Sequence, residues 1–228
     1  TIQEAIDLTG LAFDLADKYR TLVFLVADGA IGQMMEPAQF PPMRPLSQKR
    51  PEWALTGVGD REPNVITSIR MNAEDLETFN VGLQEKLERI RQNEVRYEAQ
   101  YTEDAQLVLV AFGTAARVAQ SAVKRLRDEG LPVGLVRPIT LWPFPEDPLA
   151  KLAKQAKAFL VVEMNAGQML HDVRAAINTE IPIKFLGRMG GVVPMPDEIE
   201  EQARTLLASF GNAENTLWQE NGNGHRNR

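Results

Sequence analysis

The sequence contains no cysteine and only two histidines, His171 and His225. The missing thiols exclude disulfides, thiolate nucleophiles and cysteine-ligated zinc or iron–sulfur sites on this chain. The two histidines stand far apart, without the short spacing typical of a histidine metal site. We therefore predict no metal ligands here, and any iron–sulfur cluster has to be held by another polypeptide.

Long apolar runs and an excess of positive charge are also missing. No stretch approaches the roughly 20 apolar residues of a membrane span, and no basic-then-apolar signal opens the chain. A net charge of −6 at pH 7 argues against a surface for nucleic acid or anionic membranes. We expect a cytoplasmic protein of one or two globular domains, without a nucleic-acid or membrane partner. The chain opens at Thr1 inside amphipathic sequence, which favours a fragment of a longer polypeptide.

The first 45 residues have the pattern of half an α/β unit. Apolar residues recur with a helical period over residues 2–20. Residues 22–26, L-V-F-L-V, are continuously apolar, as expected for a buried parallel strand. Asp28-Gly29 then marks a turn just beyond the carboxyl end of this strand.

A linker and a long helix are predicted next, over residues 46–104. Prolines concentrate between residues 37 and 63 without a sustained period, which is typical of an extended linker. From Leu76 to Tyr97, apolar residues recur at helical steps, and Glu85 and Arg89 have the spacing of a stabilising pair. This predicts an amphipathic helix of about 25 residues, long enough to strap across domains.

Residues 105–208 alternate between strand and helix patterns. This alternation predicts an α/β fold with three layers and a mainly parallel sheet. The polar tail, residues 209–228, is predicted to be disordered. The strands are expected at 107–112, 133–136, 158–162 and 181–186, and the helices at 114–129, 148–156, 168–177 and 196–207.

The loops that follow the strands are the expected ligand sites, because ligands of open α/β sheets gather at the carboxyl ends of the strands. At Phe112-Gly113-Thr114 the amino terminus of a helix could receive an anion. The favoured interpretation is that Gly113 makes the turn and Thr114 caps the helix. Gly190-Gly191 could approach a phosphate, although a tight connection at positive φ is the favoured interpretation. Arg188 could bind a carboxylate ligand or pair with Glu or Asp across an interface, and both remain open.

A polar cluster follows the strand at 158–162. Glu163, Asn165 and Gln168 could present acid and amide groups to a ligand, but Asn165 capping the next helix is favoured. His171 and Arg174 lie about one turn apart on that helix, where a solvated face is favoured over proton transfer.

Five strings occur in order along the chain. They are D-L-T-G-L-A-F-D-L-A-D-K-Y-R, D-G-A-I-G-Q-M-M-E-P, V-R-P-I-T-L-W-P-F-P, V-V-E-M-N-A-G-Q-M and G-R-M-G-G-V-V-P. Together they resemble one family, the alpha subunits of 2-oxoacid:ferredoxin oxidoreductases, most closely those of the 2-ketoisovalerate (3-methyl-2-oxobutanoate) type. The resemblance covers residues 1 to 208, and 2-oxoglutarate enzymes share much of this sequence.

The resemblance implies that residues 1–45 end a pyrimidine-binding thiamine-diphosphate domain and that residues 105–208 form a transketolase-C-like domain. Family members decarboxylate a 2-oxoacid on thiamine diphosphate with Mg²⁺, pass electrons through a [4Fe–4S] cluster to ferredoxin, and transfer the acyl group to coenzyme A. The implied partners are a beta subunit that carries the thiamine and the cluster, gamma and delta subunits, and ferredoxin.

The chain departs from the family's cofactor motifs. Asp28-Gly29 resembles the start of the G-D-G…N-N magnesium motif, but Ala27 replaces the first glycine and no Asn-Asn pair follows. We therefore predict no catalytic residue here and favour Asp28 as a turn-former, with Asp28 and Gln33 the candidates for a loop near an inter-subunit cofactor. The alternative from another class is an independent α/β module that binds a nucleotide or small anion at Gly113 and Gly190.

Overall fold

The computed structural model describes residues 1–43, 45, 50–57, 59–178 and 180–222, with 211–222 as backbone alone. The chain divides into two compact units. The first unit comprises Thr1–Leu25 and Met35–Arg89, and the second comprises Val26–Met34 and Ile90–Arg228. The turn that carries Asp28 therefore belongs to the unit that contains the sheet.

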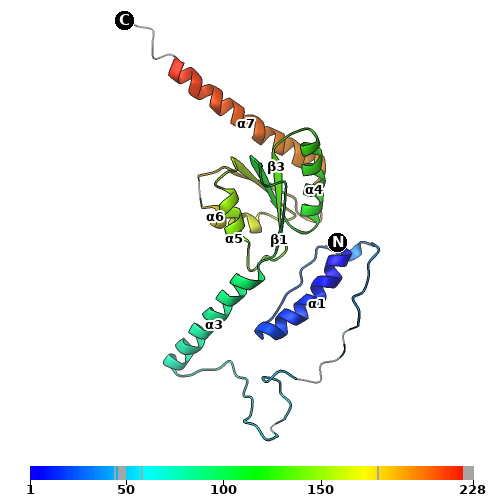
Figure 1. Cartoon of the computed structure of the whole chain (residues 1–228), viewed down its shortest axis with the longest axis vertical. Helices are drawn as coiled ribbons and strands as arrows, with labels where there is room; N and C mark the ends of the chain where they lie inside the picture. Colours follow the sequence, from blue (N-terminus) through cyan, green and yellow to red (C-terminus); the bar gives the residue numbers. More distant parts are fainter. Residues whose placement is uncertain (44, 46–49, 58, 179, 223–228) are drawn as a thin grey trace. The chain divides into compact units, whose positions relative to one another are not determined.

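Two helices form the regular structure of the first unit, although the last five residues of the second helix, from Ile90, belong to the other unit. Helix α1 (Ile2–Tyr19) starts at a capping box in which Thr1 Oγ1 accepts from the Glu4 amide and the Glu4 carboxylate accepts from the backbone nitrogen of Thr1, and it ends at Arg20 in the left-handed region, with φ +47°. Helix α3 (Ala73–Glu94) starts where the Asn72 side chain accepts hydrogen bonds from two amides of its first turn. Sequence patterns thus located both helices; in Figure 1, α1 is blue and α3 is cyan-green.

The prediction of a buried strand at residues 22–26 is wrong for this structure. These residues pair with no strand, and Leu22, Phe24 and Val26 are 81%, 82% and 77% exposed. A strand needs a hydrogen-bonded neighbour, and an apolar run needs covering layers. No other part of the described chain provides either for this segment.

The second unit is built on a five-stranded sheet of order β1-β3-β2-β4-β5. Strands β2 to β5 are parallel, and β1 pairs antiparallel with β3. The predicted α/β class with a mainly parallel sheet is confirmed. The strands are β1 (Tyr97–Gln100), β2 (Leu107–Ala111), β3 (Val133–Pro138), β4 (Ala158–Glu163) and β5 (Ile183–Gly187), and the helices are α4 (Gly113–Asp128), α5 (Glu146–Leu152), α6 (Gln168–Ile177) and α7 (Pro196–Gly222).

Helices cover both faces of this sheet, with α4 and α7 on one side and α5 and α6 on the other (Figure 1). Alternate residues of a strand point to opposite faces. Leu107 and Leu109 accordingly pack under α4 and α7, whereas Val108 and Val110 pack under α5 and α6. Both layers are apolar, which explains why the central strands read as continuous hydrophobic runs.

Two boundaries differ from the prediction. Tyr97 was placed in the long helix but begins β1, because helix α3 ends at Glu94 and the chain then pairs along β3, with Tyr97 opposite Pro138. Helix α7 runs to Gly222 instead of ending at Leu207, and the disorder of the polar tail stays a prediction. The sequence there still includes good helix formers such as Ala, Leu, Glu and Gln. Residues 223–228 lie outside the described part of the chain.

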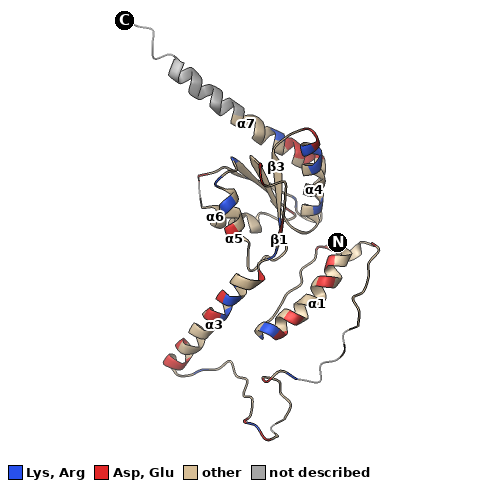
Figure 2. Ribbon diagram, viewed as in Figure 1, with Lys and Arg blue, Asp and Glu red and all other residues tan. Residues whose placement is uncertain are grey.

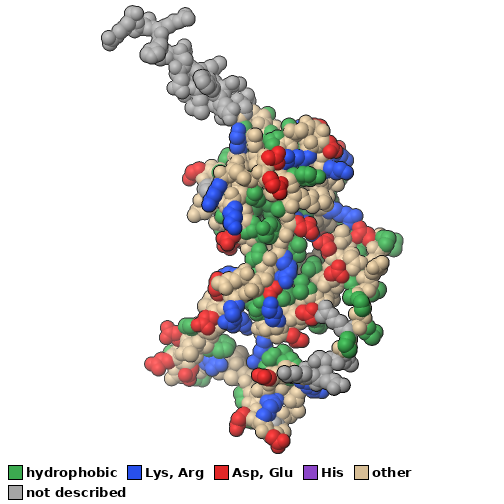
Figure 3. Space-filling model, in the orientation of Figure 1, with side chains coloured by type: hydrophobic (Ala, Val, Ile, Leu, Met, Phe, Trp, Pro, Cys, Tyr) green, Lys and Arg blue, Asp and Glu red, His purple; other side chains and the backbone are tan. Residues whose placement is uncertain are grey.

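Charged pairs join α4 to α7 at the surface of the sheet unit (Figure 2). Arg125 Nη1 lies 3.2 Å from Asp197 Oδ1 and 3.1 Å from Glu200 Oε1, and both Nη atoms of Arg204 donate to the Glu129 carboxylate. Exposed pairs of this kind contribute about 0–1 kcal/mol each. On the face shown in Figure 3, charges of both signs are interspersed.

Candidate functional site

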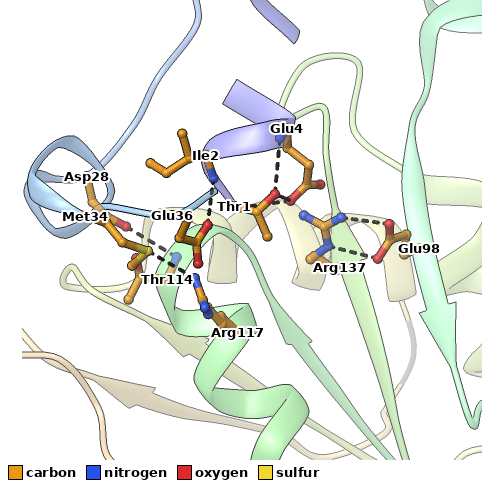
Figure 4. A network of polar contacts seen from close by, with 10 residues as sticks. All are labelled: Thr1, Ile2, Glu4, Asp28, Met34, Glu36, Glu98, Thr114, Arg117 and Arg137. Carbon is orange, nitrogen blue, oxygen red and sulfur yellow. Dashed lines mark hydrogen bonds and ion pairs between the residues drawn. The ribbon is translucent and has the colours of Figure 1, made fainter. Parts of the chain in front are cut away.

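Asp28 lies at the start of the short helix α2 (Gly29–Gln33) and is its N-cap. Its Oδ1 accepts a hydrogen bond from the Ile31 amide at 2.9 Å, and its Oδ2 accepts one from the Thr114 amide at 3.3 Å. Figure 4 shows Asp28 facing Thr114 at the first turn of α4. The prediction that Asp28 shapes this turn is confirmed, whereas its role toward a cofactor stays a prediction.

The ionisation of Asp28 is set by opposing effects. Burial raises the pKa of its carboxyl, but hydrogen bonds from the amides of Ile31, Thr114 and Ala30 favour the charged form and hold the pKa below the usual 3.8. The Thr114 hydroxyl also favours the charge, although Oγ1 is not in hydrogen-bond geometry with any described residue. Asp28 therefore presents a negative charge at neutral pH.

The turn between β2 and α4 was predicted only in part. Gly113 makes the turn as predicted, with φ +58°. The expectation that Thr114 caps the helix is wrong, because neither Phe112 nor Thr114 provides a side-chain cap. The side chain that accepts the free amide is Asp28, 86 residues earlier in the chain. No local sequence signal connects positions that far apart.

Glu163 is a fully buried carboxylate at the end of β4. Its Oε1 accepts from the Leu170 amide at 3.0 Å, and its Oε2 accepts from the Met169 amide and the Asn165 side chain, both at 2.9 Å. Asn165 Oδ1 in turn accepts from the amides of Gly167 and Gln168 at 2.7 and 3.0 Å. The predicted capping role of Asn165 is confirmed, and Glu163 completes the start of α6 instead of facing a ligand.

In the loop after β5, the side chain of Arg188 is paired with another residue of the same chain. Arg188 pairs with Glu198, whose Oε2 also accepts the Met195 amide at 3.0 Å next to the start of α7. Of the two interpretations of Arg188, the structure shows a carboxylate partner, and that partner lies within the same chain. Gly190 and Gly191 have φ +70° and +87°, so the predicted tight connection at positive φ is confirmed.

The remaining candidates are isolated from these contacts. Gln33 is exposed at the last position of α2, and His171 is exposed on α6. Across the described ranges, no three His, Asp or Glu side chains converge in a way that could hold a metal ion. No helix in the described part is both long and apolar enough to cross a membrane.

Comparison with known proteins identifies the sheet unit. Residues 105–199 match the family model "Pyruvate:ferredoxin oxidoreductase core domain II". In the solved structures, a 2-oxoglutarate:ferredoxin oxidoreductase from Magnetococcus marinus, with 2-oxoglutarate, coenzyme A and succinyl-CoA bound, superimposes with a TM-score of 0.54 at 25% identity, over 60% of this chain and 24% of that chain. Along most of its length the chain is similar to subunits of 2-oxoacid:ferredoxin oxidoreductases, the family that its sequence motifs resemble.

Among curated relatives, the chain is similar to a ketoisovalerate oxidoreductase subunit VorB. The protein from Methanothermobacter thermautotrophicus is 45% identical over 88% of this chain and 57% of its own length. A 2-oxoglutarate synthase subunit KorA from Methanocaldococcus jannaschii is 31% identical over 88% of this chain and 60% of its own length. The chain thus spans a little over half the length of the curated relatives it matches.

Proposed function

We propose that the protein containing this chain acts in a 2-ketoisovalerate (3-methyl-2-oxobutanoate):ferredoxin oxidoreductase. The reaction is oxidative decarboxylation of a branched 2-oxoacid to an acyl-CoA with reduction of ferredoxin. The supporting observation is the 45% identity to a ketoisovalerate oxidoreductase subunit over 88% of the chain. The second candidate is 2-oxoglutarate, supported by the 31% identity to a 2-oxoglutarate synthase subunit.

Within that enzyme, residues 1–45 end a pyrimidine-binding domain and residues 105–208 form a transketolase-C-like domain. The exposed apolar segment at residues 22–26 supports the first assignment. Its side chains are apolar on both faces, as in an interior parallel strand, so it needs neighbouring strands and helices that the described residues do not provide.

Thiamine diphosphate, Mg²⁺ and the [4Fe–4S] cluster belong mainly to a beta subunit in this proposal, and gamma and delta subunits and ferredoxin complete the assembly. The chain has no cysteine for a cluster. The loop at Asp28 also lacks the ligand set of a magnesium–diphosphate site: both carboxylate oxygens accept backbone amides, and no group of three or more His, Asp or Glu side chains forms a metal site in the described residues. The chain alone is expected to be inactive.

Substrate class is tested on the complete protein assembled with its partner subunits. Reduction of ferredoxin is measured with coenzyme A and, in turn, 3-methyl-2-oxobutanoate, 2-oxoglutarate and pyruvate. We expect the highest kcat/KM for the branched oxoacid. Preference for 2-oxoglutarate would favour the second candidate, and no turnover of any 2-oxoacid by the intact assembly would refute the proposal.

The independent binding module is tested on the chain itself. Calorimetric titration with thiamine diphosphate and with adenine nucleotides should show no binding. Micromolar affinity for a nucleotide would favour a separate anion-binding function. The occupation of the α4 amino terminus by Asp28 speaks against that function, since the amide nearest an incoming anion already has an acceptor.

A further inference from the structure

Asp28 joins two segments that are distant in sequence. One carboxylate oxygen binds the first turn of α2 and the other binds the first turn of α4 (Figure 4). Both segments lie in the unit that contains the sheet, although the residues on either side of the Asp28 segment belong to the other unit. The contact therefore depends on residues 26–34 lying against the sheet unit.

The start of α4 is suited to hold a carboxylate. The helix is 16 residues long, and its free amides carry partial positive charge. Phe112 at the N-cap has no polar side chain to offer these amides. An ionised acceptor makes a stronger hydrogen bond to such an amide than a neutral one.

The residues at this turn leave room for the carboxylate and surround it with donors. A Cβ at Gly113 would lie 3.5 Å from Asp28 Oδ2, an ordinary van der Waals contact, so it is the φ of +58° that favours glycine at this position. Thr114 is only 8% exposed, and its Oγ1 is buried without a hydrogen-bond partner in the described structure. This hydroxyl lies beside the carboxylate and is an additional potential donor to it.

We propose that the amino terminus of α4 is an internal carboxylate-binding site with Asp28 as its ligand, and that this bond holds residues 28–34 against the sheet unit. Asp28 is in this view a positioning residue for the loop that carries Gln33. The inference does not depend on the oxoacid that the enzyme uses, so its test is separate from the substrate assay.

The test compares the complete 228-residue chain with its Asp28→Ala and Asp28→Asn variants by hydrogen exchange. In Asp28→Ala, the amides of residues 29–34 and of residues 113–116 should become less protected together, each by about fivefold, the usual effect of removing a helix cap. Asp172→Ala, which removes an exposed carboxylate from α6, should change neither segment.

Asp28→Asn separates the two bonds, and it remains informative if Asp28→Ala fails to fold. The amide side chain offers only one oxygen, so it can cap α2 or accept the Thr114 amide, but not both. We expect one segment to lose protection and the other to keep it. In the unaltered chain, the Thr114 amide shift should titrate in acid, and this titration should disappear in Asp28→Asn. Unchanged exchange in both segments of the folded variants, or a Thr114 amide that is insensitive to acid, would overturn the proposal.

Discussion

Glu163→Gln is the substitution for which the structure gives the clearest expectation. It changes one atom of a side chain that is fully buried and engaged with donors only. Three hydrogen bonds end on the carboxylate, from the amides of Met169 and Leu170 and from the Asn165 side chain. A glutamine keeps the shape but replaces one acceptor with an NH₂ donor.

Neither orientation of the introduced amide satisfies this site. With the NH₂ at the Oε1 position it faces the Leu170 amide, and with the NH₂ at the Oε2 position it faces two donors. Asn165 cannot turn its own amide to help, because its Oδ1 already accepts from Gly167 and Gln168. The better orientation loses one hydrogen bond and buries two unsatisfied donors, which costs about 1–3 kcal/mol.

The free energy of unfolding of Glu163→Gln is measured by urea denaturation, followed by circular dichroism. A loss of about 2 kcal/mol lowers the midpoint by roughly 1 M, for a slope of about 2 kcal/mol per molar. Glu103→Gln is the matched control, because it removes the same charge from an exposed position and should change stability by less than about 0.5 kcal/mol. Equal midpoints for the Glu163 variant and the unaltered chain would refute the assignment of Glu163 as a buried acceptor.

Three further predictions concern packing and charge. Gly134→Ala should destabilise the sheet by about 1–3 kcal/mol in the same assay, because the added Cβ would lie 2.7 Å from the Tyr101 carbonyl oxygen. The control is Gly82→Ala in α3, where the added Cβ meets open space, so this variant should be neutral or more stable by up to about 1 kcal/mol. Equal losses of stability in the two variants would contradict this explanation. Leu109→Ala removes a fully buried side chain from a central strand and should cost about 2–5 kcal/mol in thermal or urea unfolding, so a cost below about 1 kcal/mol would count against this core. The pKa of Asp28 is lowered in the fold, so its contribution to stability should be complete above pH 3.8, the usual pKa of the group, and disappear as the pH falls through the lower folded pKa. The measurement is the difference in unfolding free energy between the unaltered chain and Asp28→Asn at a series of pH values. A difference that vanishes well above pH 3.8 would disprove the predicted direction.

The sheet unit could be predicted from sequence because its signals are local. Each central strand is a short apolar run, and each helix has one apolar face, so the order of strands and helices follows from periodicity. Even the internal use of Asn165 follows from a local capping pattern. Strand β1 could not be recognised in the same way, because it has only four residues, includes the weak strand formers Glu98 and Ala99, and is held by pairing with β3.

The polar contacts depend on which segments meet in space. Residues 22–26 show why backbone structure cannot always be predicted from composition. Their composition predicts an interior strand, but a strand forms only where another segment offers hydrogen bonds. No such segment is available here among the described residues, and these residues stay exposed. Asp28 shows why the contacts of a site cannot be fully predicted from the sequence. Its identity and the glycine after it predicted a turn, whereas its second partner, the Thr114 amide, is far away in sequence.

The sequence by itself determined the family resemblance, the α/β alternation and the absence of cysteine thiols, because these depend on composition, short-range periodicity and co-linear motifs. Only the tertiary structure decided what the polar groups at the strand ends do. Glu163 and Arg188 follow strands of the sheet and Asp28 caps α2, yet each meets a partner within the chain, because folding brings complementary donors or charges to them.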